Sequence, residues 1–306
     1  MREVAIVSAG MGSFGELWSL SLRDVFAEAA LEAIEGAGID QLDAIYVGNM
    51  AGGTIAKMAA RGYEIREVIA TNNERGTLDM DWSPRFTAET RREEARAGAR
   101  VLGLDPEVEF LGYEDGRLSE TPLNELRERC MRAIRTHRPH VLFTWDPFAP
   151  YEEHQDHRSV AMAATEAAAF SHFPLYHPEH RDEGLMPHYV GERYYFAKSP
   201  VDVNKVVDIS GYIEKKIEAL CAHVCQMEMT VMDFQAQLAA SGLDIPALAG
   251  ADPKNYRPIL EAQIKAWAAS VGRRAGFEYG EEFRRTRFGG VERWGREFGV
   301  ELPDDV

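Results

Sequence analysis

The feature that most limits how this chain can fold is an alternation of short apolar segments with longer helical ones. Apolar segments cover residues 4–8, 44–47, 65–71, 108–111 and 141–145, and helical patterns follow at residues 21–35, 54–61, 87–102, 123–137 and 154–170. Strands that alternate with helices in this way form βαβ units and a mainly parallel sheet. The sequence therefore predicts a three-layer α/β domain.

The rest of the chain is less regular. We expect a His- and Pro-rich loop whose histidines lie on the surface, two strands, one long helix that begins at a Ser210 cap, and a shorter helix. A basic, aromatic tail follows, in which we interpret Arg284, Arg285 and Arg287 as a solvated face. The loop covers residues 171–187, the strands 194–197 and 206–209, the long helix 210–238, the shorter helix 259–270 and the tail 283–294. The domain should thus carry helical decoration at its C-terminal end.

The charge balance limits the partners. Lys and Arg number 34 against 50 Asp and Glu, a net charge of −16, which repels nucleic-acid phosphates and anionic lipids. No apolar run reaches the roughly 18 residues of a membrane helix. The three cysteines suit a reducing compartment better than a disulfide scaffold. We expect a cytoplasmic protein that acts on a small molecule, with no nucleic-acid or membrane partner; a homo-oligomer is left open.

Polar loops follow three consecutive strands of the predicted sheet, and parallel sheets bind ligands at that edge. The last loop leads into His154-Gln155-Asp156-His157. At a helix start, His154 and His157 face the same way, and Asp156 could fix the tautomer of one ring. An alternative stays equally open: these are solvated residues at a helix start, where the helix dipole favours Asp156.

Several stretches of the sequence match the motifs of a known family. The matching stretches are GGTIAKMAARG (52–62), TNNERGT (71–77), TRREEARAGARVLGL (90–104), LGYEDGRL (111–118), PHVLFTWDP (139–147) and HQDHR (154–158). From about residue 51 the chain resembles the LmbE/PIG-L family of zinc-dependent N-acetylglucosaminyl deacetylases. The resemblance implies a Rossmann-like fold with a mainly parallel sheet. It also implies hydrolysis of an acetamide on an N-acetylated amino sugar, or a similar small amide, with Zn²⁺ or another divalent metal.

The resemblance also assigns roles to individual residues. His157 matches the metal-binding histidine of the family, and His154 matches the histidine that stabilises the tetrahedral oxyanion. Asp156 matches the carboxylate between them, and Arg91 and Asp115 fall where the family places polar residues of the substrate pocket. A catalytic zinc needs three protein ligands and a water, so this segment alone cannot complete the site.

One motif of the family is missing. A His-Pro-Asp-Asp sequence, which supplies two metal ligands and the general base, should stand just before Gly52; residues 47–51 read VGNMA instead. Glu74 or Asp146 would have to substitute for it. The missing motif leaves a second interpretation, a catalytically impaired or inactive pseudo-deacetylase that keeps its pocket.

The first fifty residues resemble a different family. MREVAIVSAGMGSFGE and DAIYVGNMAGG are similar to the N-terminus of a thiolase. We therefore predict a grafted thiolase-like segment at residues 1–50 and a deacetylase domain at residues 51–306. A thiolase-like acyltransferase is the weakest function, because the nucleophilic cysteine that a thiolase carries beyond this segment is absent.

Overall fold

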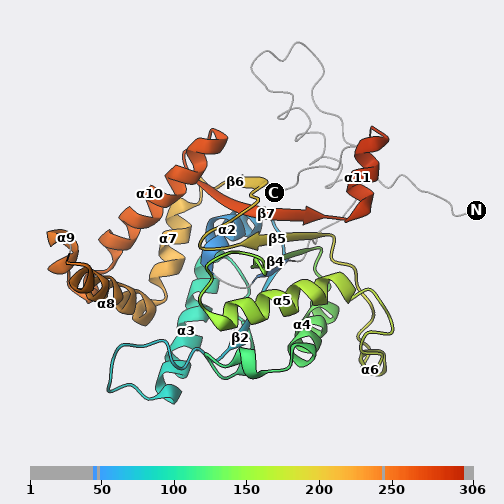
Figure 1. The fold of residues 1–306 in the computed structure, drawn as a ribbon, viewed down its shortest axis with the longest axis horizontal. Helices are drawn as coiled ribbons and strands as arrows, with labels where there is room; N and C mark the ends of the chain where they lie inside the picture. Colours follow the sequence, from blue (N-terminus) through green and yellow to red (C-terminus); the bar gives the residue numbers. More distant parts are fainter. Residues whose placement is uncertain (1–43, 47–48, 243–244, 300–306) are drawn as a thin grey trace, which may run out of the picture. The chain divides into compact units, whose positions relative to one another are not determined.

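Seven strands form one mixed sheet in the part of the chain that the computed structural model describes, residues 44–46, 49–242 and 245–299 (Figure 1). The strand order is β3-β2-β1-β4-β5-β7-β6; β1 to β5 run parallel, and β7 runs antiparallel to both β5 and β6. The bounds are β1 Ala44–Tyr46, β2 Ile65–Thr71, β3 Glu109–Tyr113, β4 Val141–Trp145, β5 Glu192–Phe196, β6 Lys205–Asp208 and β7 Gly280–Arg287. The predicted α/β fold with a mainly parallel sheet is confirmed.

Helices cover both faces of the sheet. Helices α4 (Leu123–His137) and α5 (Gln155–Phe170) pack together on one face. On the other face α2 (Gly52–Ala60), α3 (Pro84–Leu102) and α7 (Ile213–Cys221) pack together (Figure 1). Other helices and turns are η1 Asn49–Ala51, η2 Leu118–Glu120, α6 Glu179–Asp182, α8 Val224–Ser241, α9 Pro246–Ala249, η3 Pro253–Asn255 and α10 Arg257–Ala275. No helix among the described residues is long and apolar enough to cross a membrane.

Residues 43–289 form one structural unit, which contains the whole sheet. Helix α11 (Gly290–Glu297) belongs to a second unit. Residues 44–46 of the strand predicted at 44–47 are confirmed as β1, where Ala44 lies opposite Ile65 of β2 and Val141 of β4, and residue 47 lies outside the described residues. The strand and helix expected within residues 1–43 lie outside the described residues.

The long helix expected at residues 210–238 is wrong, because it divides into α7 and α8 at His223. At the break His223 lies so close to α3 that a Cβ on Gly98 would come within 2.8 Å of its Nε2. Ser210 does not cap the helix, because its hydroxyl donates to Asp208 Oδ1 (2.6 Å); the N-cap of α7 is Tyr212. Local helix periodicity does not reveal such a break, since it depends on the neighbouring helix.

Strand β7 was not predicted, since its residues Arg284, Arg285 and Arg287 were interpreted as a solvated face. Three of its charged residues form ion pairs with residues outside the strand. Glu281 pairs with Lys216 (2.5 Å), Glu282 with Arg274 (2.6 Å), and Arg284 with Asp146 (2.6 Å). A polar sequence can therefore fill an inner position of the sheet when tertiary ion pairs replace apolar packing.

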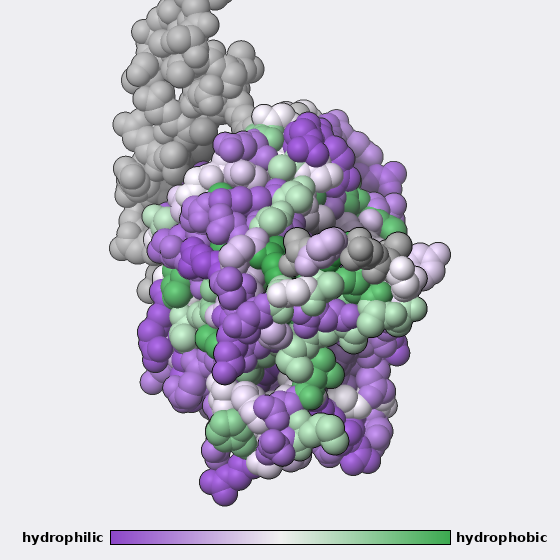
Figure 2. All heavy atoms as spheres, turned by 90° about the vertical axis from the view of Figure 1, so that its left-hand side faces the viewer, coloured by the Kyte–Doolittle hydropathy of each residue, from purple (hydrophilic) through white to green (hydrophobic). Residues whose placement is uncertain are grey.

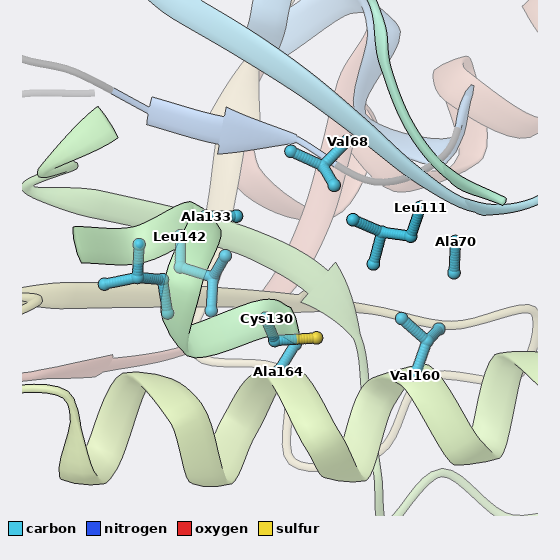
Figure 3. Close-up of a pocket in the computed structure, with 9 residues that line it drawn as sticks. Val68, Ala70, Leu111, Cys130, Ala133, Leu142, Val160 and Ala164 are labelled. Carbon is cyan, nitrogen blue, oxygen red and sulfur yellow. The ribbon is translucent and has the colours of Figure 1, made fainter. Parts of the chain in front are cut away.

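A cavity of about 30 Å³ lies between the sheet and helices α4 and α5 (Figure 3). Its walls are almost entirely apolar, and they are formed by Val68, Ala70, Leu111, Cys130, Ala133, Ile134, Leu142, Val160 and Ala164. Burial raises the pKa of the Cys130 thiol to about 12, so this thiol stays protonated and packs as a small apolar side chain. The core is thus underfilled beside α5.

We expect Val160→Ile to stabilise the protein by about 0.5 to 1 kcal/mol, because the added methylene enters this cavity and both side chains are β-branched. The matched control is Val207→Ile. Val207 is 1% exposed and does not line the cavity, so its enlargement should cost about 1 to 3 kcal/mol. Urea unfolding of the three proteins measures both effects. Equal destabilisation by the two changes would show that the cavity cannot accept a methylene.

Candidate active site

The candidate site lies where β2, β3 and β4 end and their following loops meet. The amide of Arg75, after β2, donates to Asp115 Oδ2 after β3 (3.1 Å). The amide of Gly116, in the same loop as Asp115, donates to Asp156 Oδ2 at the start of α5 (2.6 Å). The first turn of α5 lies to the left in Figure 1, and Figure 2 views the molecule from that side, where hydrophilic residues surround scattered hydrophobic ones. The polar loops expected at one sheet edge do come together.

Asp156 connects two of these loops. It is 4% exposed, and its Oδ1 accepts a further hydrogen bond from the amide of Leu118 (3.0 Å). Both carboxylate oxygens thus hold the turn after β3 against α5. The expected hydrogen bond from an imidazole N–H to the Asp156 carboxylate does not form. Instead the main-chain amide of Asp156 donates to Nδ1 of His154 (3.3 Å). Asp156 therefore positions Asp115 and His154 by way of the backbone.

His154 is exposed and forms the N-cap of α5. Because Nδ1 of His154 accepts the Asp156 amide proton, the neutral ring carries its own proton on Nε2. Nε2–H is consequently a hydrogen-bond donor at the edge of the site. A fixed donor of this kind can stabilise an oxyanion, which is the role that the resemblance assigns to His154.

His157 is held on three sides. Its ring lies between Trp145, at a centroid distance of 4.0 Å, and His154, at 4.4 Å, and is nearly parallel to both. Its Nδ1 lies 3.2 Å from Glu152 Oε1. Burial lowers the pKa of His157 to about 4, helped by repulsion from His154. The ring is therefore neutral at pH 7, and its Nε2 is left for a ligand.

Glu152 is the acceptor for several donors at once. Its Oε1 accepts hydrogen bonds from Lys198 Nζ (3.0 Å) and from the amide of His154 (3.1 Å). Burial alone would raise the pKa of the Glu152 carboxyl, but these hydrogen bonds outweigh burial and hold the pKa below its usual range. Glu152 is therefore an ionised carboxylate at the base of the histidine pair, and it was not predicted as a site residue.

Arg91 is buried beside the site, with 5% of its surface exposed. Its guanidinium donates to the carbonyl of Gly76, in the loop after β2, and to Gln226 of α8. Arg91 therefore fixes the β2 loop against α8. Its assignment to the substrate pocket, like that of Asp115, stays a prediction.

Three ligand atoms at this edge are close enough to share an ion. Asp115, His154 and Asp156 each offer one atom, and these lie within 4.8 Å of one another. His157 belongs to no such group of three among the described residues. Asp146 cannot substitute for the missing ligands, because Arg284 donates to both of its carboxylate oxygens at 2.6 Å. The described residues thus do not complete a three-ligand zinc site on His157.

Glu74 remains a candidate ligand. It follows β2, and its Oε2 is buried without a hydrogen-bond partner among the described residues. A buried carboxylate oxygen without a partner is costly, and an ion or a water would satisfy it. Glu74 shares no group of three potential ligands among the described residues, so its role as a substitute for the missing motif stays a prediction.

A second group with metal-ligand chemistry, His177, Glu179 and His180, is structural. Nδ1 of His180 lies 3.1 Å from the guanidinium of Arg135, which also donates to the carbonyls of Ser171, Phe173 and His177. A metal ion there would face this cation. His180 is fully buried, so the expectation of a surface histidine is wrong at that position. This group anchors the loop before β5.

The fold and this edge define a Rossmann-like α/β protein with a His- and carboxylate-lined candidate active site. The model of the family "PIG-L: GlcNAc-PI de-N-acetylase" matches residues 47–168. Diacetylchitobiose deacetylase of Thermococcus kodakarensis is 32% identical over 184 residues, which cover 60% of this chain and 67% of the relative. The chain belongs to the PIG-L family.

Solved structures support the same assignment. The N,N'-diacetylchitobiose deacetylase from Pyrococcus horikoshii matches with a TM-score of 0.66 at 26% identity, over 82% of this chain and 88% of that one. A further relative supports the resemblance to a thiolase. Acetyl-CoA acetyltransferase of Methanothermobacter thermautotrophicus is 51% identical over 59 residues, which are 19% of this chain and only 15% of the relative. The described elements therefore follow the deacetylase fold.

Proposed function

We propose that this protein is a metal-dependent hydrolase that removes the acetyl group from an N-acetylated amino sugar of the N-acetylglucosamine type, or from a similar small amide. The observation that carries the proposal is the gathering of His154, His157, Asp156 and Asp115 at one sheet edge, inside the segment that matches the family model. The two deacetylases named above act on diacetylchitobiose. A small N-acetylated sugar is thus the proposed partner, and the low cysteine content favours a cytoplasmic location.

In this proposal the chain's own residues orient the acyl group. His154 donates its Nε2–H to the oxygen that becomes negative in the tetrahedral intermediate. Asp156 and Arg91 hold the surrounding loops in place through the hydrogen bonds described above. His157 is the proposed ligand of the divalent ion, which would supply an activated water and polarise the acyl oxygen. Among the described residues, His157 shares no group of three potential ligands that could hold an ion.

Acetate release tests the proposal. Purified protein is incubated with N-acetylglucosamine and diacetylchitobiose in the presence of Zn²⁺, and acetate is measured before and after treatment with a chelator. We expect release that the chelator abolishes and that added Zn²⁺ restores. Release unaffected by the chelator would contradict the metal requirement, and no release from any N-acetylated sugar would contradict the hydrolase.

A second candidate function is sugar binding without catalysis. Two observations favour it: the sequence lacks a His-Pro-Asp-Asp motif, and His157 shares no group of three potential ligands within the described ranges. This candidate predicts calorimetric binding of diacetylchitobiose with no acetate formed at any metal concentration. The same acetate assay therefore separates the two functions.

A further inference from the structure

The loop between β4 and α5 contains a buried carboxylate whose contacts converge on one histidine ring. Only 5% of the Glu152 side chain is exposed. Its Oε1 lies 3.2 Å from Nδ1 of His157 and also accepts from Lys198 and from the His154 amide. Because this oxygen already accepts from an ammonium group and from an amide, it is the acceptor in its contact with His157 as well. The proton in the contact between Glu152 and His157 must therefore belong to the imidazole.

The backbone that carries Glu152 is fixed as well. Arg158, one turn into α5, donates to the main-chain carbonyls of Glu152 (2.5 Å) and Glu153 (2.8 Å). Lys198, just after β5, holds the carboxylate from a second element. Both the main chain and the side chain of Glu152 are thus held by hydrogen bonds from other elements.

The ring of His157 has little freedom to turn. Trp145 stacks on one face with an interplanar angle of 12°, and His154 stacks with an angle of 17°. A sandwiched ring with one tethered nitrogen keeps one orientation. The remaining variable is which nitrogen carries the proton, and a neutral histidine in water favours Nε2. A specific acceptor is needed to reverse that preference.

We infer that Glu152 is a positioning residue that holds His157 in the Nδ1–H tautomer, so that Nε2 keeps an unprotonated lone pair. Carboxylates that orient metal-binding histidines act in this way. The inference rests on the proposed function only in its assumption that His157 takes part in the reaction. The tautomer itself is a property of the metal-free protein, and it can be measured without any activity.

The tautomer is read from two-bond ¹H–¹⁵N correlations of the imidazole rings in metal-free protein, with the His157 signals assigned by their loss in His157→Gln. We expect the wild type to carry the proton on Nδ1. In Glu152→Leu the acceptor is gone, and the proton should move to Nε2. The matched control is Glu153→Leu, which changes the exposed neighbouring carboxylate and should leave the His157 tautomer unchanged.

A second variant covers the case in which Glu152→Leu does not fold. In Glu152→Gln the amide can accept from Nδ1 or donate to it, so a mixture of both tautomers is expected. If the hydrolase proposal also holds, Glu152→Leu or Glu152→Gln should weaken divalent-ion binding by roughly 10- to 100-fold. A wild-type His157 protonated on Nε2, or an Nδ1–H tautomer that persists in the variants, would overturn the inference whatever the activity.

Discussion

Replacing His154 with alanine is expected to lower kcat for acetate release by about 10²- to 10³-fold, because the Nε2–H donor to the developing oxyanion is lost. His154 is an exposed helix cap whose ring contributes one main-chain hydrogen bond, 3.3 Å long, to the fold. The free energy of unfolding should therefore fall by no more than about 1 to 2 kcal/mol. Steady-state kinetics and urea unfolding of the same preparation separate the two effects.

Two controls accompany this prediction. His154→Asn keeps a side-chain N–H donor and should recover part of kcat. His177→Ala removes a histidine from the structural group near α6 and should leave kcat at the wild-type value. A His154→Ala variant that retains full kcat would show that His154 does not stabilise the oxyanion.

The second large effect concerns stability. Glu281 of β7 is almost fully buried, pairs with the equally buried Lys216 at 2.5 Å, and accepts hydrogen bonds from the amides of Gly53 (2.8 Å) and Thr54 (2.7 Å) at the start of α2. Glu281→Ala is expected to cost about 3 to 5 kcal/mol, because it leaves a buried ammonium group unpaired and uncaps the helix. Equilibrium urea denaturation measures the loss.

Glu282→Ala is the matched control, since Glu282 is adjacent but pairs with Arg274, whose side chain is 60% exposed and can turn to solvent. We expect it to cost about 1 kcal/mol. Adding Lys216→Met to Glu281→Ala removes the unpaired charge and should restore part of the lost free energy. If the Glu281 and Glu282 changes cost the same, the buried pair does not stabilise the fold as described.

The same Glu281 lies against the glycine pair that begins α2. The carboxylate occupies the helix N-terminus, where a bound phosphate would otherwise sit. A side chain at position 53 would also collide with Ile209, because a Cβ on Gly53 would come within 2.7 Å of it. Gly53 therefore allows close packing against Ile209, and its amide helps to bind the Glu281 carboxylate.

Much of the sheet could be predicted from the sequence because its parallel strands are short apolar runs. The bounds predicted for β2, β4 and α4 agree with the structure residue for residue. Strand β7 could not be predicted, since Glu281, Glu282 and Arg284 fit a strand only because their partners lie far along the chain. Charge pairing across such separations has no local signal.

The candidate site divides in the same way. The histidine pair was predictable from its spacing and its place after an apolar strand. Glu152 was not, because Glu152 and Glu153 are identical in type, and only the fold buries one of them and exposes the other. Two carboxylates directly before a His-x-x-His spacing were the available signal, and they are equally typical of a solvated loop.

The proposed join between residues 1–50 and 51–306 stays a prediction, but β1 gives it a physical consequence. This strand falls within the first segment, yet it lies between β2 and β4 in the middle of the sheet. The segment that lacks the His-Pro-Asp-Asp motif thus still supplies the strand that the fold requires. Loss of the motif and preservation of the sheet are compatible.

Whether the edge around His157 binds a divalent ion is the central question, and calorimetric titration of the chelator-treated protein with Zn²⁺ answers it most directly. We predict a saturable signal of one ion per chain in the wild type that is lost in His157→Gln. His177→Gln should bind like the wild type. A titration of folded wild-type protein without heat of binding, or the same binding in His157→Gln, would contradict the assignment.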